Sequence, residues 1–187
     1  MKVEEKIWTA PNIISFLRIL LTFGFAASFW SEQFILAAGL FAAAGFCDVL
    51  DGYIARRFNL ISRLGTLLDP LADKFLIITA FVCLVSKGWV PVWLFLLVVA
   101  REIIILNGIF WGLTLKKALI GDFNPSKLSK LNTLVQVALV LLVLFLVGNR
   151  GDYFWLYQTL LWTVVVLTVA SGVHYIFKGL DFRQKEN

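Results

Sequence analysis

Four aspartates stand in two pairs within an otherwise apolar stretch of the chain. Asp48 and Asp51 are three residues apart, and Asp69 and Asp73 are four residues apart. Residues at these spacings share one face of a helix, so each pair presents two carboxylates on the same side. A short connection joins the two helices expected here, which makes them antiparallel neighbours. The four carboxylates are therefore expected to converge near that connection.

Four carboxylates this close would repel one another and take up protons unless cations neutralised them. The basic residues of this stretch are mostly spread toward the connection and do not match the cluster in number or position: Arg56, Arg57, Arg63 and Lys74. We therefore expect two divalent cations, and hard oxygen ligands favour Mg2+ or Mn2+ over zinc. Two metal ions held by carboxylates are typical of phosphoryl transfer, in which a carboxylate takes the proton of an attacking hydroxyl and Arg56 pairs with a phosphate.

Glycines interrupt the same stretch. Gly52 directly follows Asp51, and Gly65 lies four residues before Asp69, on the same stripe of the helix. A glycine beside a carboxylate cleft lets a ligand approach the backbone. The alternative is that these glycines only allow close packing of helices, which is common in membranes. Their alignment with the aspartates favours the ligand interpretation.

The composition shows which kind of protein must position these residues. Of 187 residues 60% are hydrophobic and only 16% charged, and the mean hydropathy is +0.86. A water-soluble globule and a disordered chain both have far lower hydrophobicity. We expect one all-α membrane domain over residues 1–187. Cys47 and Cys83 both lie in apolar runs, which argues against a disulfide framework.

Windows of about 20 apolar residues, the length that spans a bilayer, predict six transmembrane helices. Polar or turn residues separate them, and a short interfacial segment around Ile7 and Trp8 precedes the first. The predicted spans are residues 11–30, 34–57, 63–86, 90–115, 128–148 and 153–177. An even number of spans places both termini on the same side of the membrane.

The distribution of Lys and Arg orients these spans. Only Lys87 and Arg150 fall on the side away from the termini. Twelve fall on the side of the termini: Lys2, Lys6, Arg56, Arg57, Arg63, Lys116, Lys117, Lys127, Lys130, Lys178, Arg183 and Lys185. The positive-inside rule then puts both termini and the aspartates on the cytoplasmic side, or on the matrix side of an organelle inner membrane. The net charge of +5 is explained by this topology and by anionic lipid headgroups, so no nucleic-acid partner is expected.

Three further charges fall within the predicted spans: Arg18, Arg101 and Glu102. Charged residues in a membrane are costly and face a polar interior, which makes them candidates for function. Arg101 and Glu102 fit structural pairing best, and because helix neighbours point about 100° apart, we expect each to pair with another helix. An ion or metal transporter is the alternative from outside enzymology. The clustering of the charges toward one face and the lack of an inverted repeat argue against it.

The stretch from Asp48 to Asp73 resembles the signature of the CDP-alcohol phosphotransferase family. That signature is Asp-x2-Asp-Gly-x2-Ala-Arg-x8-Gly-x3-Asp-x3-Asp, and all eight fixed positions match. A weaker similarity extends from Pro11 through Arg18 and Arg101 to Gln136. The resemblance implies six transmembrane helices, a polar cleft that opens to the cytoplasmic face, a site for two metal ions and a homodimer.

The resemblance also implies roles for individual residues. Asp48, Asp51, Asp69 and Asp73 would bind the metal ions, and Asp73 would also be the general base that activates the acceptor hydroxyl. The residues that would border the cytidine nucleotide and its phosphates are Gly52, Ala55, Arg56 and Gly65. The donor would be CDP-diacylglycerol, and the acceptor oxygen would displace CMP.

Two subgroups of the family differ in the acceptor, which is phosphatidylglycerol in one and glycerol 3-phosphate in the other. The glycerol-phosphate enzymes typically carry two cations at positions that Ile109 and Asn132 occupy in this chain. A phosphate close to a dianion needs matched cations. The sequence therefore favours phosphatidylglycerol, with cardiolipin as the product, and phosphatidylglycerophosphate synthesis is the alternative. The residues expected to bind the acceptor are Arg101, Lys116, Lys127, Lys130 and Asn132.

Overall fold

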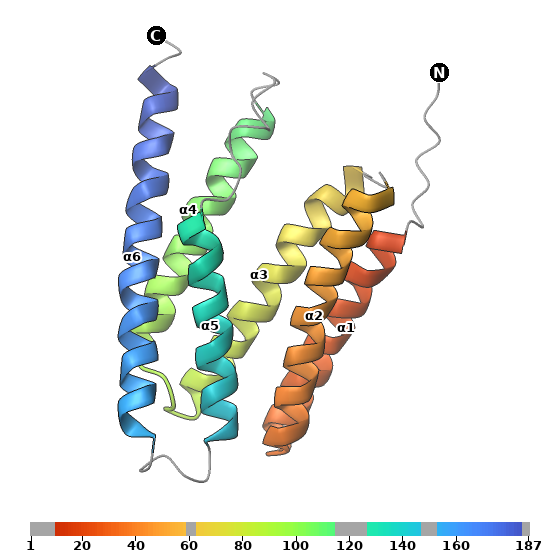
Figure 1. Cartoon of the computed structure of the whole chain (residues 1–187), viewed down its shortest axis with the longest axis vertical. Coiled ribbons are helices and arrows are strands. Elements are labelled where there is room, and N and C mark those ends of the chain that lie inside the picture. The colour runs from red at the N-terminus through yellow and green to blue at the C-terminus, as the bar shows by residue number, and fades with distance from the viewer. Residues whose placement is uncertain (1–9, 59–62, 115–126, 147–152, 185–187) are drawn as a thin grey trace. The chain divides into compact units, whose positions relative to one another are not determined.

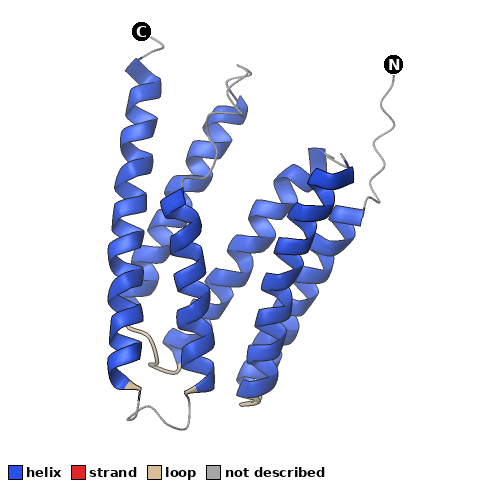
Figure 2. Cartoon of the chain, viewed as in Figure 1, coloured by secondary structure: helices blue, strands red, loops and turns tan. Residues whose placement is uncertain are grey.

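The computed structural model describes the backbone of residues 10–58, 63–114, 127–146 and 153–184, and the side chains of residues 14–47, 71–105, 128–146 and 153–175. Within these ranges the chain forms helices joined by turns, with no strand (Figure 2). The helices are α1 (Ala10–Trp30), α2 (Phe34–Phe58), α3 (Arg63–Ser86), α4 (Val92–Thr114), α5 (Lys127–Phe145) and α6 (Phe154–Gln184).

Each of the six predicted spans coincides with one helix, so the helical prediction is confirmed. The largest difference is at the end of α6, which continues to Gln184 although the predicted span ends at residue 177. Hydropathy marks where a chain becomes polar, whereas a helix continues until a residue breaks it, and residues 178–184 contain no proline. Among the described residues two helical segments are long and apolar enough to cross a membrane, Leu128–Phe145 and Phe154–Tyr175.

The described contacts divide the chain into two compact units. Unit 1 comprises residues 1–87 and 141–148, and unit 2 comprises residues 88–140 and 149–187. Unit 1 therefore contains α1, α2 and α3 with the end of α5, and unit 2 contains α4, most of α5 and α6 (Figure 1).

The core of unit 1 combines aromatic side chains of α1 and α2 with buried small residues of α2. The Phe25 ring lies 5.5 Å from the ring of Phe41 and 6.2 Å from that of Phe29. Ala37 and Ala44 are fully buried on α2, and small residues let helix backbones approach closely. α1 contacts both α2 and α3, and α2 also contacts α3.

A tight helix ending reverses the chain between α1 and α2. The Gln33 amide donates to the Ser28 carbonyl at 2.9 Å, and the Glu32 amide donates to the Phe29 carbonyl at 3.0 Å. This is the Schellman arrangement, and Glu32 takes its left-handed position with φ 61°. The Lys87 ammonium reaches the Glu32 carboxylate at 2.8 Å, so the end of α3 is tied to this turn.

Unit 2 is organised by the packing of α4 against α6. The Tyr157 hydroxyl donates to the Trp89 carbonyl at 3.0 Å, and the rings of Trp93 and Trp162 lie 6.1 Å apart. These contacts join the start of α4 to the first turns of α6. Further along α4, Leu94 and Val98 are fully buried. The core of unit 2 becomes polar beyond Val98, as described below.

Candidate active site

The four aspartates lie on α2 and α3, toward the end of α2 and the beginning of α3. Asp48 and Asp51 lie in the second half of α2, and Asp69 and Asp73 lie in the first half of α3. The two helices run antiparallel and contact each other within unit 1 (Figure 1). The backbone therefore places the four positions at the same end of this helix pair, as the spacing predicts. The side chains of the first three aspartates lie outside the described residues, as do those of the predicted nucleotide-binding residues Gly52, Ala55, Arg56 and Gly65.

Asp73 is the aspartate whose side chain the structure describes. Its carboxylate is 27% exposed, so it is partly buried but open to a ligand. Its Oδ2 atom lies 3.8 Å from the Lys74 ammonium. A carboxylate so placed can bind a metal ion or accept a proton from a hydroxyl. The donor set that the backbone brings together consists of oxygen ligands alone, which fits Mg2+ or Mn2+.

A polar stripe on α1 faces the interior of unit 1 and was only partly predicted. Ser15, Arg18 and Thr22 are each fully buried, at helical spacings of three and four residues. The Thr22 hydroxyl donates to the Arg18 carbonyl at 2.8 Å. The sequence indicated Arg18 through its charge alone. The signal for Ser15 and Thr22 was their spacing on the same side of an apolar helix.

A second buried polar group joins the three helices of unit 2, and we call it the α4–α6 polar cluster. Its members on α4, α5 and α6 are Arg101, Glu102, Ser129, Asn132, Gln136, Thr168 and Ser171, and each is at most 7% exposed. Arg101 is at its centre. Its Nε atom donates to the Ser171 hydroxyl at 3.3 Å, and its Nη2 atom donates to the Ser129 carbonyl at 3.4 Å and to the Ser129 hydroxyl.

The pairing of Arg101 differs from the prediction. The sequence led us to expect that Arg101 and Glu102 each pair with another helix, but Nη1 of Arg101 forms an ion pair with Oε1 of Glu102 itself. The long guanidinium arm overcomes the 100° offset between helix neighbours, because it can curl back while its other nitrogens reach α5 and α6. The prediction that each charge forms its ion pair with another helix is therefore wrong, although the hydrogen bonds of Arg101 do reach α5 and α6.

The residues expected to bind the acceptor differ in their burial, and the structure describes the side chains of only some of them. Arg101 and Asn132 belong to the α4–α6 polar cluster, whereas Lys130 is exposed on α5. Lys127 begins α5, but its side chain is not described, and Lys116 lies outside the described residues. The hydroxyl of Thr168 donates to Oδ1 of Asn132 at 3.1 Å, which ties α5 to α6.

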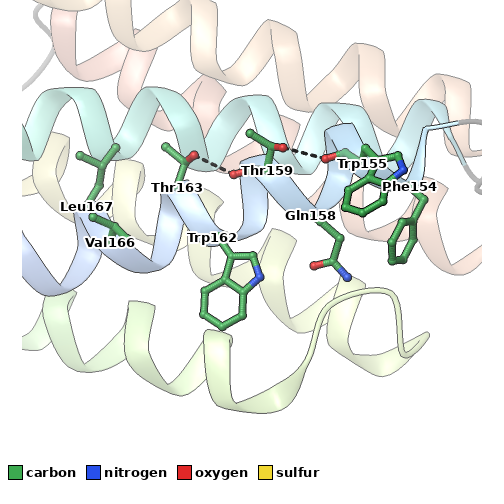
Figure 3. Close-up of a pocket in the computed structure, with 8 residues that line it drawn as sticks. All are labelled: Phe154, Trp155, Gln158, Thr159, Trp162, Thr163, Val166 and Leu167. Carbon is green, nitrogen blue, oxygen red and sulfur yellow. Dashed lines mark hydrogen bonds between the residues drawn. The ribbon is translucent and has the colours of Figure 1, made fainter.

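A groove that the sequence did not predict runs along the first half of α6 (Figure 3). Its lining residues are Phe154, Trp155, Gln158, Thr159, Trp162, Thr163, Val166 and Leu167. The two threonine hydroxyls donate to carbonyls of their own helix, Thr159 to Trp155 at 2.8 Å and Thr163 to Thr159 at 2.7 Å. Satisfied hydroxyls and exposed rings make this a largely apolar surface, suited to lipid contact rather than to the chemistry of the aspartates.

Comparison with known proteins agrees with the motif. The sequence model of the CDP-alcohol phosphatidyltransferase family matches residues 8–170. The chain is 36% identical over 185 residues to a human protein named cardiolipin synthase (CMP-forming), covering 91% of this chain and 61% of that protein. It is 34% identical over 180 residues to a Rickettsia bellii protein named CDP-diacylglycerol–glycerol-3-phosphate 3-phosphatidyltransferase, covering 94% and 96% of the two chains.

A Bacillus subtilis protein that carries the same name as the Rickettsia protein is 33% identical over 155 residues, covering 82% of this chain and 78% of that one. The chain thus spans about three fifths of the human relative and nearly the whole of the Rickettsia relative. Both acceptor subgroups anticipated from the sequence are represented among these relatives.

Proposed function

Because the chain belongs to the CDP-alcohol phosphatidyltransferase family, we propose that it transfers a phosphatidyl group from CDP-diacylglycerol to an alcohol and releases CMP. The observation that carries this proposal is the placement of the four motif aspartates. All eight signature positions lie on α2 and α3, and these two helices contact each other within unit 1.

In the proposed reaction a hydroxyl oxygen of the acceptor attacks the phosphorus attached to diacylglycerol. The new phosphorus–oxygen bond forms as the bond from that phosphorus to the CMP oxygen breaks, and CMP leaves with the electron pair. Asp73 accepts the proton of the attacking hydroxyl, a role that its partial exposure permits. Gly52, Ala55, Arg56 and Gly65 bind the CDP moiety.

Asp48, Asp51, Asp69 and Asp73 would hold two divalent cations, Mg2+ or Mn2+. When bound, these ions neutralise the pyrophosphate and the charge that develops on the leaving CMP. The donor set supports this assignment, because four carboxylates without a matching group of bases require cations at neutral pH.

We propose phosphatidylglycerol as the acceptor and cardiolipin as the product. Asn132 supports this choice because it is a neutral side chain, buried in unit 2, where a phosphate dianion would require a cation. The alternative acceptor is glycerol 3-phosphate, with phosphatidylglycerophosphate as the product. Exposed Lys130, together with Lys116 and Lys127 in the sequence, favours that alternative, because lysines could bind the smaller phosphate.

We also propose that the protein is an integral membrane homodimer with six spans, a polar cleft and both termini at the cytoplasmic or matrix face. The excess of Lys and Arg in the connections on that side supports the orientation. The two long apolar segments on α5 and α6 support the membrane location. The homodimer rests on the family resemblance.

Metal-dependent release of CMP separates this proposal from a transporter. Purified protein is incubated with CDP-diacylglycerol, Mg2+ and phosphatidylglycerol, and CMP is measured for the wild type, for Asp69→Ala and for Glu32→Ala. Glu32 is the matched control because it is a carboxylate in the turn before α2, at the end of that helix away from Asp48 and Asp51. The proposal predicts that Asp69→Ala loses turnover while it remains folded, and that Glu32→Ala keeps it. Full activity in folded Asp69→Ala would refute the metal-site assignment.

A further inference from the structure

Arg18 lies on a regular buried stripe of α1. Ser15, Arg18, Thr22, Phe25 and Phe29 follow one another at spacings of three and four residues, and each is fully buried. The stripe is aromatic toward the end of α1, whereas toward the beginning it is polar and carries the positive charge of Arg18. A guanidinium excluded from water requires a nearby anion, because burying an uncompensated charge is very costly.

A matching stripe runs along α2. Ala37, Phe41 and Ala44 are at most 1% exposed and stand at spacings of four and three residues. The next two positions of this repeat are Asp48 and Asp51. The helical register thus places the first two motif aspartates on the continuation of the face of α2 that packs against α1.

The ring contact between Phe25 and Phe41 sets the register between the two helices. The ring centroids lie 5.5 Å apart, and the short turn at residues 31–33 makes α1 and α2 an antiparallel pair within unit 1 (Figure 1). The pairs that this register makes level on either side are fully buried on both helices: Phe29 with Ala37, and Thr22 with Ala44. Seven residues from the ring contact, which is two helical turns, the same register brings Arg18 level with Asp48.

The other carboxylates of unit 1 are less suited to this role. Among its described side chains these are Glu32 and Asp73. Glu32 is 14 residues from Arg18, about 20 Å along the helix axis, and Lys87 engages it at 2.8 Å. Asp73 has a lysine ammonium 3.8 Å away. The α1–α2 register therefore favours Asp48 as the anion that compensates Arg18.

We infer that Arg18 is the permanent counter-charge of the aspartate site, with Asp48 as its electrostatic partner. Arg18 is then a positioning residue. Because it is fully buried, it does not contact the substrate, and its role is to stabilise the first motif aspartate when the site holds no cation. One guanidinium leaves three of the four negative charges, so divalent cations are still needed. The inference rests on the proposed function in taking the four aspartates as metal ligands.

The first test is thermal unfolding of the purified protein in detergent, once in EDTA and once in saturating Mg2+. The variants are Arg18→Met, which removes the charge, and Arg18→Lys, which keeps it. Thr22→Val is the matched control, because it removes a polar group from the same buried stripe, but one whose hydrogen bond stays within α1.

In EDTA, Arg18→Met should lower the Tm by about 6–20 °C, the range for a buried ion pair that loses one partner. Mg2+ should raise the Tm of Arg18→Met more than that of the wild type, because a site with one positive charge fewer binds cations more tightly. Arg18→Lys should keep most of the stability, and Thr22→Val should gain as much from Mg2+ as the wild type. Equal gains for Arg18→Met and the wild type would assign Arg18 a packing role and overturn the inference.

The second test identifies the partner. The loss of Tm caused by Arg18→Met is measured in EDTA in the wild type, in Asp48→Asn and in Asp73→Asn. The inference predicts that Asp48→Asn removes at least half of this loss and that Asp73→Asn leaves most of it, because a pair interaction is lost only once. Coupling to Asp73, or to neither aspartate, would contradict the inference. If Arg18→Met alone does not fold, the double variant with Asp48→Asn decides, because it folds only if Asp48 is the partner.

These measurements separate the inference from the proposed function. The coupling between Arg18 and Asp48 is measured without metal or substrate, so a wild type that shows it but releases no CMP refutes the proposed function alone. A wild type that releases CMP but shows no coupling refutes the inference and leaves the phosphatidyltransferase activity standing. A wild-type Tm that does not respond to Mg2+ refutes the metal site and the role of Arg18 as its counter-charge.

Discussion

The Arg101 guanidinium and the Glu102 carboxylate form a buried ion pair although they are chain neighbours on α4. Both side chains are at most 2% exposed, and the remaining guanidinium nitrogens reach Ser129 on α5 and Ser171 on α6. One arginine therefore links all three helices of unit 2. Its charge is compensated locally, which lets it remain in a bundle interior.

Removal of one partner of this pair should destabilise unit 2 strongly. Arg101→Met leaves the Glu102 carboxylate buried without its cation, and the expected loss is about 3–5 kcal/mol. The double variant Arg101→Met with Glu102→Leu removes both charges and should recover much of that loss. Thermal unfolding of the purified protein in detergent measures the loss in the single variant and the recovery in the double variant. Equal Tm values for the single and double variants would show that the ion pair is not the source of the effect.

Asp73→Asn should abolish most of the turnover without unfolding the protein. The substitution preserves size but removes the proton acceptor and one metal ligand, and loss of a general base alone reduces kcat roughly 10²- to 10⁴-fold. CMP release reports the activity, and the Tm reports the fold. If Asp73→Asn kept wild-type kcat, another residue would have to accept the proton.

Removal of divalent cations should stop the reaction reversibly. Treatment with EDTA should eliminate CMP release, and addition of excess Mg2+ or Mn2+ should restore it, because hard oxygen ligands prefer these ions. Asp48→Asn should raise the concentration of Mg2+ that gives half-maximal activity. Persistent activity in EDTA would argue against the carboxylate metal site, whatever the acceptor.

The contact between Glu32 and Lys87 predicts a pH dependence of stability. The hydrogen bond from Lys87, and secondarily its charge, lowers the pKa of Glu32 below its ordinary value of 4.5. A carboxyl group whose pKa is lowered in the folded state stabilises that state above its unfolded pKa, and the stabilisation is lost as the pH falls through the folded pKa.

The wild type should therefore have a slightly higher Tm than Glu32→Gln at pH 7, and the difference should vanish when the pH falls below the lowered pKa of Glu32. The effect is small because the pair is exposed. Lys87→Gln serves as the matched variant and should reproduce Glu32→Gln. A Tm difference that persists in acid would assign the effect to the left-handed conformation of Glu32 rather than to the ion pair.

The helices could be predicted from the sequence because local polar and turn residues determine where they begin and end. The turn at residues 31–33 and the break at Lys87–Gly88 interrupt long apolar runs, and the structure ends α1 and α3 at Trp30 and Ser86. The shared faces of the aspartate pairs followed from helical spacing alone. The extension of α6 beyond residue 177 could not be predicted from the hydropathy, because a chain can become polar without its helix ending.

The interior of unit 2 was less predictable. The charge of Arg101 marked it as buried or functional, but its partners depend on rotamers and on which faces of α5 and α6 meet α4. Gln136 shows the same limit, because a polar side chain in an apolar helix gives no sign of whether a partner satisfies it. Only the packed structure shows that Thr168 engages Asn132 and that the Gln136 amide is buried with no partner among the described residues.

The most direct test of the proposed function is a product assay. Purified protein receives CDP-diacylglycerol and Mg2+ with either phosphatidylglycerol or glycerol 3-phosphate, and the lipid product is identified by mass alongside the CMP released. We predict cardiolipin and CMP with phosphatidylglycerol and no phosphatidylglycerophosphate with glycerol 3-phosphate. Phosphatidylglycerophosphate as the sole product would contradict the proposed acceptor, and absence of CMP in both reactions would contradict the proposed phosphatidyl transfer.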